Sequence, residues 1–179
     1  ALLGNVPELV VPSYVVRSPW ELLLYLALGL IVGALAALFI DGHFRIKDRF
    51  DALKLPKLAK PLLGGLLVGL IGIGFPQVFG NGYEFMETVL FGKQTWYLLA
   101  ALILIKAVAT SITLGSGLPG GLFAPCLYLG AVTGGAFGQL MTKVFQAAGL
   151  APGAYALVGM GAFLSAATHS PMTAIFLLF

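Results

Sequence analysis

The sequence predicts an all-α domain that spans a membrane several times, and three observations carry this prediction. Of the 179 residues, 59% are hydrophobic and only 9% are charged, against roughly 25% charged residues in an average soluble domain. A chain this apolar cannot cover its surface with polar groups in water, so its solvent is lipid. The apolar runs are also unequal in length, and Gly and Pro break them. Discontinuous, tilted helices of this kind are typical of transporters rather than of simple bundles.

The composition also excludes several classes of function. The net charge is only +3, and the basic residues do not follow a face that could track phosphates, so nucleic acid is a poor partner. The sequence contains no HExxH, no GxSxG and no pair of carboxylates at membrane depth, so we expect no enzyme activity, cofactor or metal. The single cysteine, Cys126, is interpreted as a small buried hydrophobe.

The first helix is predicted to begin after a proline-punctuated connection, residues 1–19. Ser18 and Glu21 can form a capping box, and Pro19 fits the first helical turn. The apolar run from Trp20 to Ile40 is long enough to cross the bilayer.

The polar stretch 41–61 is predicted to be a cytoplasmic loop. The flanking connections carry only Arg17 and Lys93, so the positive-inside rule assigns this stretch to the cytoplasm. The loop serves either as this topology signal or as a binding surface for lipid or a partner. Its basic residues are Arg45, Lys47, Arg49, Lys54, Lys57 and Lys60.

Two further apolar runs follow, Leu62 to Phe79 and Trp96 to Leu114. In the first, the spacing Gly65-x-x-x-Gly69 permits another helix to approach closely. Between the runs, Glu84 and Glu87 form either a solvated face or a proton or metal site.

Lys106 lies near the centre of the run from Trp96 to Leu114. A lysine within the membrane is costly and suggests a function by default. It is either functional or a structural lysine paired with a carboxylate or backbone carbonyls. In the functional case, it could be the coupling group of a secondary transporter for another solute.

The last apolar run, Ala154 to Ala167, is too short to span the full bilayer and ends at a break. There, Ser170 is placed as an N-cap and Pro171 as the first residue of a new helix. His169 within the break is either a proton relay or a capping residue.

Residues 115–125 form the candidate functional segment. One helix ends in their glycines, and a new one is predicted to start near Gly121. Gly130, Gly134 and Gly138 then recur every four residues and permit tight packing of that helix. The unpaired amides and positive dipole end of a helix N-terminus attract small anions. Without a Cβ, Gly121 permits close approach of an ion. The alternative is a turn that merely links two helices.

The string Gly121-Leu122-Phe123-Ala124-Pro125 resembles the Gly-x-Phe-x-Pro signature of the CLC family of chloride channels and proton–chloride antiporters. The resemblance extends upstream through Gly115-Ser116-Gly117-x-Pro119-Gly120 and downstream through Gly159-Met160-Gly161-Ala162 and Ser170-Pro171-Met172-Thr173. It covers essentially the whole chain.

The resemblance implies the second half of a CLC-type pore domain, residues 1–179, in an integral protein of the plasma membrane. It implies a homodimer in which each subunit has its own anion pathway. The backbone amides of Leu122 and Phe123 would contact chloride, and Gly121, Ala124 and Pro125 would complete the turn. We interpret both ends of the chain as lying inside a longer protein. The family's glutamate-bearing loop is absent from its required place, so channel and exchanger both stay open.

Overall fold

The computed structural model describes residues 20–56, 58–145 and 151–178, and those residues fold into helices without strands. The predicted all-α fold is therefore confirmed. The α-helices are α1 (Trp20–Ala52), α2 (Ala59–Gly74), α3 (Tyr83–Leu90), α4 (Trp96–Gly115), α5 (Phe123–Phe145), α6 (Pro152–Thr168) and α7 (Pro171–Leu178), and a short 3₁₀ helix, η1 (Pro76–Val78), follows α2.

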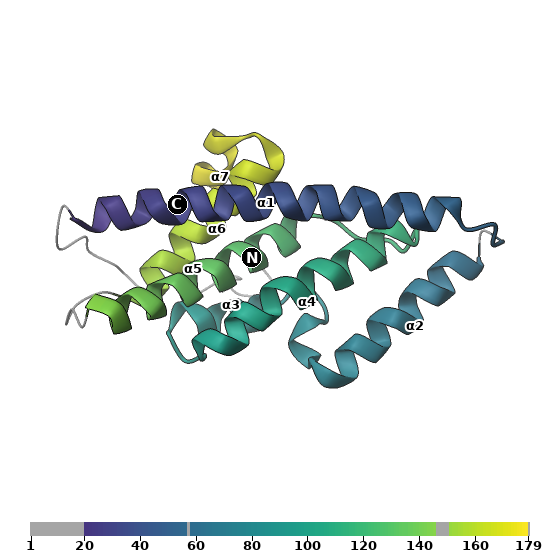
Figure 1. The fold of residues 1–179 in the computed structure, drawn as a ribbon, viewed down its shortest axis with the longest axis horizontal. Helices are drawn as coiled ribbons and strands as arrows, with labels where there is room; N and C mark the ends of the chain where they lie inside the picture. The colour runs from purple at the N-terminus through teal and green to yellow at the C-terminus, as the bar shows by residue number, and fades with distance from the viewer. Residues whose placement is uncertain (1–19, 57, 146–150, 179) are drawn as a thin grey trace, which may run out of the picture.

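Helix α1 lies along the long axis of the molecule, and α4, α5 and α6 pack beside it (Figure 1). Helix α2 extends away at the end where α1 finishes (Figure 1). The core lies where α1, α4, α5 and α6 meet, with Leu28, Leu99, Tyr128 and Phe163 almost fully buried. Among the residues that the structure describes, two helices, α1 and α4, are long and apolar enough to cross a membrane.

Helices α5 and α6 pack through glycines, which confirms the close packing predicted from the four-residue spacing. A Cβ on Gly130 would lie 2.6 Å from the Met160 Cα, and one on Gly134 would lie 2.7 Å from the Tyr155 carbonyl carbon. Gly159 faces Gly130 from α6 with equally little room. The two backbones touch, so only glycine fits at these crossing points.

The polar stretch 41–61 is not a loop throughout, which corrects the sequence-based expectation. Helix α1 continues to Ala52, because no Gly or Pro interrupts residues 43–52. The chain is non-helical from Leu53 to Pro56. Arg45, Lys47 and Arg49 therefore lie on α1, and Lys60 lies on α2.

Helix α2 also differs from its prediction. It ends at Gly74 and does not continue to Phe79, because Pro76 opens η1 and proline cannot continue an α-helix. A Cβ added to Gly65 or Gly69 would meet no heavy atom within 4 Å among the described residues, whereas Gly64 packs against the Ser116 side chain. The contact to the end of α4 is therefore made by a different glycine.

The break between α6 and α7 lies where the sequence predicts it. Helix α7 begins at Pro171 as expected, and the Ser170 carbonyl accepts the Ala174 amide at 3.2 Å. His169 ends α6 in the left-handed region, with φ 53°. The predicted cap at Ser18 and Pro19 lies outside the described residues.

Candidate functional site

Helix α4 ends in a tight hydrogen-bonded turn, just before the segment that leads to α5. The Leu118 amide donates to the Thr113 carbonyl at 3.2 Å, and the Gly117 amide donates to the Leu114 carbonyl at 3.1 Å. Gly117 itself has φ 88°, as the left-handed residue of a Schellman motif requires. This closure uses glycine's conformational freedom and turns the chain toward α5.

Helix α5 then begins at Phe123, two residues later than the predicted start. Its first hydrogen bond runs from the Cys126 amide to the Leu122 carbonyl, at 2.9 Å. Among the described residues, no protein acceptor is found for the amides of Leu122, Phe123 and Ala124, and Pro125 has no N–H to satisfy. The first turn of α5 thus presents three unpaired donors together with the positive end of the helix dipole.

The side chains of the signature leave this turn open. Gly121 is exposed, with no heavy atom within 4 Å of a Cβ position, and Phe123 is 39% exposed. Leu122 is half-buried and packs against the core, so its side chain anchors the turn. Ala124 and Pro125 are also half-buried. The polar feature of the segment is therefore its backbone.

A cavity of about 310 Å³ lies beside the turn. Pro119, Gly120 and Gly121 form part of its wall, whereas Leu122 to Pro125 do not line it. Other lining residues come from α4, namely Lys106, Thr110 and Thr113, and from the connection after η1, namely Gly80 and Asn81. The structure therefore places Gly121 and Lys106 in the wall of the same cavity.

Lys106 is held by backbone carbonyls, which is one of the two structural pairings considered from the sequence. Its side chain is almost fully buried, and its Nζ donates to the Val78 carbonyl at 2.7 Å and to the Gly80 carbonyl at 2.9 Å. The ammonium also lies 4.9 Å from the centre of the Tyr128 ring, within range of a cation–π interaction. The lysine therefore ties the connection after η1 to α4 and α5.

The remaining sequence candidates do not assemble into a site. Glu84 is exposed and Glu87 is half-buried on α3, and no group of three metal-ligating side chains occurs among the residues that the structure describes. His169 is exposed at the end of α6. Cys126 is 1% exposed, which confirms its interpretation as a buried hydrophobe.

Thr110 and Thr113 were not predicted as part of the site. The sequence spacing could have identified them, because residues 106, 110 and 113 fall on the same face of a helix as one another. The contributions of Gly80 and Asn81 could not be found in this way, since they come from a different segment. Only the tertiary fold brings that segment to Lys106.

The fold and the site together define a class: an integral membrane protein with broken helices, in which one helix begins with unpaired amides next to a segment that lines a cavity. Comparison with known sequences specifies this class further. The whole chain, residues 1–179, matches the voltage gated chloride channel family, and the chain belongs to that family.

Several curated relatives are similar over most of this chain. A ClcB-like chloride channel protein of Ralstonia nicotianae is 38% identical over 94% of the chain. The chloride channel protein CLC-f of Arabidopsis thaliana is 40% identical over the full length of this chain. The H(+)/Cl(-) exchange transporter ClcA of Klebsiella pneumoniae is 37% identical over 86% of it. The aligned region spans 39%, 25% and 34% of these three relatives, respectively.

Proposed function

We propose that the protein containing this chain transports chloride or a similar small anion across a membrane, and that the start of α5 binds the anion. The single observation that carries this proposal is the set of unpaired amides at Leu122, Phe123 and Ala124. Partial charges suit a permeating ion, which must bind firmly enough to enter and weakly enough to leave. The names of the relatives, which include chloride channels and a proton–chloride exchanger, support the choice of ion.

The charge of Lys106 supports the same proposal in a second way. A buried ammonium in the cavity wall makes the hollow beside Gly121 electropositive, which favours an anion over a cation. Its two carbonyl bonds and the Tyr128 ring fix its position. A lysine held in this way is poorly suited to the alternative role of a mobile coupling group for another solute.

The proposal extends to the arrangement of the whole protein. Residues 1–179 would form a single partial domain, the second half of a CLC-type pore. The protein would act as a homodimer in the plasma membrane, with the basic end of α1 and the following residues to 61 in the cytoplasm, as the positive-inside rule predicts.

Chloride flux from liposomes that contain the full-length protein tests the site. In Gly121→Leu, the new side chain occupies the space from which an ion would reach the amides, because that space is open in the structure. We expect flux to fall by about tenfold or more, which corresponds to about 1.4 kcal/mol. The matched control is Gly33→Leu on α1, where the Cβ position is also free of other atoms. Equal flux in the two variants would count against the site.

A further inference from the structure

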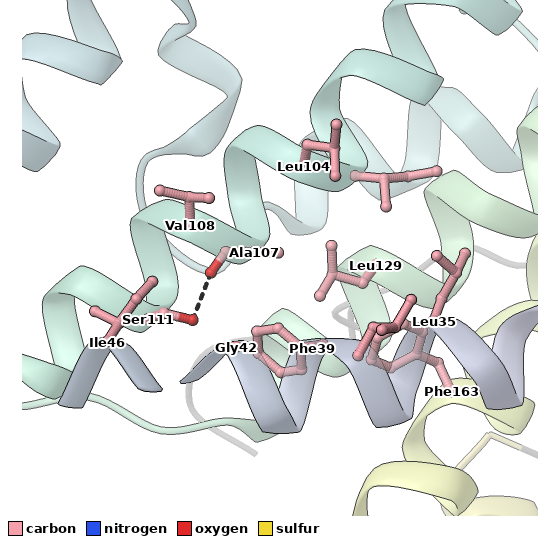
Figure 2. A pocket seen from close by; sticks show the side chains of 12 residues that line it. Leu35, Phe39, Gly42, Ile46, Leu104, Ala107, Val108, Ser111, Leu129 and Phe163 are labelled. Atoms are coloured by element: carbon pink, nitrogen blue, oxygen red, sulfur yellow. Dashed lines mark hydrogen bonds between the residues drawn. The ribbon is translucent and has the colours of Figure 1, made fainter. Parts of the chain in front are cut away.

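An apolar groove of about 210 Å³ runs between α1 and α4 (Figure 2). Leu129 and Phe163 contribute to it from α5 and α6, and Leu104 stands on its α4 side. Its one hydroxyl, on Ser111, donates to the Ala107 carbonyl of its own helix at 2.8 Å, as the dashed line in Figure 2 shows. The groove therefore presents an apolar surface to whatever enters it.

The dimensions of the groove suit a single hydrocarbon chain. Its α1 wall is formed by Leu35, Leu38, Phe39, Gly42 and Ile46. Leu35 and Ile46 are eleven residues apart, so this wall is about 16.5 Å long. That length is close to the roughly 15 Å depth of the hydrocarbon of one leaflet. A helix is about 10 Å wide, and over this length it would occupy several times the volume of the groove. The space thus fits a chain of methylenes better than another helix.

One end of the groove is closed by protein and bordered by positive charge. There, α4 comes against α1, since a Cβ on Gly115 would lie 3.2 Å from the Lys47 backbone. Successive residues of a helix are rotated by about 100° around its axis. Viewed along α1, Arg49 therefore lies about 20°, and Arg45 about 60°, from Gly42. Both arginines continue the face that lines the groove. Lys47 lies about 140° away from it.

The two arginines are accessible to a ligand. Arg45 and Arg49 are exposed. The carboxylate of Asp41 lies 3.9 Å from the Arg45 guanidinium, and both side chains are more than 70% exposed. An exposed ion pair of this kind is weak, so it leaves Arg45 able to bind an anion. Guanidinium groups also match the geometry of phosphate oxygens.

We propose that this groove is a binding site for an anionic phospholipid. One acyl chain lies between α1 and α4, and the phosphate of the headgroup contacts Arg45 and Arg49. The charge complementarity at one end and the apolar groove behind it match the two parts of such a lipid. By the positive-inside rule the arginines face the cytoplasmic leaflet, where anionic lipids are concentrated.

Lipid retention by the full-length protein tests the headgroup contact. The protein is exchanged into detergent with equal amounts of phosphatidylglycerol and phosphatidylcholine, and bound lipid is counted by native mass spectrometry. The double variant Arg45→Gln/Arg49→Gln should lose about thirtyfold in affinity for phosphatidylglycerol, since each basic residue at an anionic surface contributes about fivefold. The double variant Lys47→Gln/Lys54→Gln removes the same charge, from one residue on the other side of α1 and one beyond its end, and should retain the lipid. An equal loss in both variants would overturn the proposal.

A second variant tests the acyl-chain contact. Gly42 lines the groove, and its Cβ position has no atom within 4 Å, so the side chain of Gly42→Leu can start there and extend into the groove. It should displace the lipid, whereas Gly33→Leu, on the opposite face of α1, should not. Undiminished lipid binding by Gly42→Leu would contradict the proposal.

A photo-crosslinking amino acid at Leu104 identifies the occupant directly. In membranes, mass spectrometry should find it joined to lipid. Adducts to a peptide would show that protein fills the groove and would overturn the proposal. These measurements count lipid and not ion flux, so the proposal can fail while chloride transport stands, and the reverse also holds.

Discussion

The glycine contact between α5 and α6 gives a prediction whose size follows from the structure. In Gly130→Ala, the added methyl carbon would lie 2.6 Å from the Met160 Cα. Carbon atoms in favourable contact are about 3.5–4.0 Å apart, so the helices must separate by about 1 Å. Overpacking of this kind destabilises a protein by about 1–3 kcal/mol, and sometimes by more.

The expected change is measurable as a thermal shift. For a cooperative unit of 150–250 residues, each kcal/mol corresponds to about 2–4 °C, so Gly130→Ala should lower the Tm by about 2–12 °C. Thermal unfolding of the purified full-length protein, followed by size-exclusion chromatography after heating, provides the assay. Gly33→Ala is the control, because its methyl group meets no atom and alanine favours a helix by up to about 1 kcal/mol over glycine.

The same variant should affect transport. Gly130 lies seven residues, or about 10.5 Å, along α5 from Phe123, so a displaced α5 carries the unpaired amides with it. Chloride flux by Gly130→Ala in liposomes at a temperature below its Tm should therefore fall relative to Gly33→Ala. A Tm for Gly130→Ala equal to that of the control would refute the reasoning about the contact.

Two other substitutions test neighbouring features. Lys106→Met leaves the Val78 and Gly80 carbonyls without their donor, which costs about 1–3 kcal/mol for each, partly offset by removal of a buried charge. Its Tm should be lower than that of Lys106→Arg, and equal values would argue against the carbonyl contacts. Gly117→Ala forces a left-handed alanine at φ 88°, which costs about 1–2 kcal/mol. An unchanged Tm for this variant would show that the closure of α4 tolerates a side chain.

Much of the helical layout could be predicted from local features of the sequence. Pro171 marks the start of α7 because proline fits only the first turn of a helix. The four-residue spacing of Gly130, Gly134 and Gly138 indicates a flat face because such residues lie on one side of a helix. These predictions needed only the geometry of a single helix.

The features that sequence reasoning missed depend on contacts between distant segments. Lys106 lies 28 residues from Val78 and 26 from Gly80, and no spacing rule connects them. Gly65 and Gly69 fit a helix-packing motif, yet Gly64 makes the contact with Ser116, because the rotation of α2 is set by its neighbours. The groove between α1 and α4 likewise arises only when two helices pack imperfectly.

The start of α5 could be predicted from the sequence only in part. The signature from Gly121 to Pro125 predicted a helix N-terminus, and the structure begins the helix at Phe123. The position of the cavity depends on α4 and the connection after η1, so it could not be derived from the signature alone. The site residues themselves stay a prediction until an anion is observed there.

The most direct test of the anion site is crystallography of the full-length protein with bromide in place of chloride. Bromide scatters X-rays anomalously, so its position can be found independently of the protein atoms. We expect a peak within hydrogen-bonding distance of the Leu122 and Phe123 amides, on the side of Gly121. A map without bromide at this turn, in which those amides instead donate to protein atoms, would contradict the account.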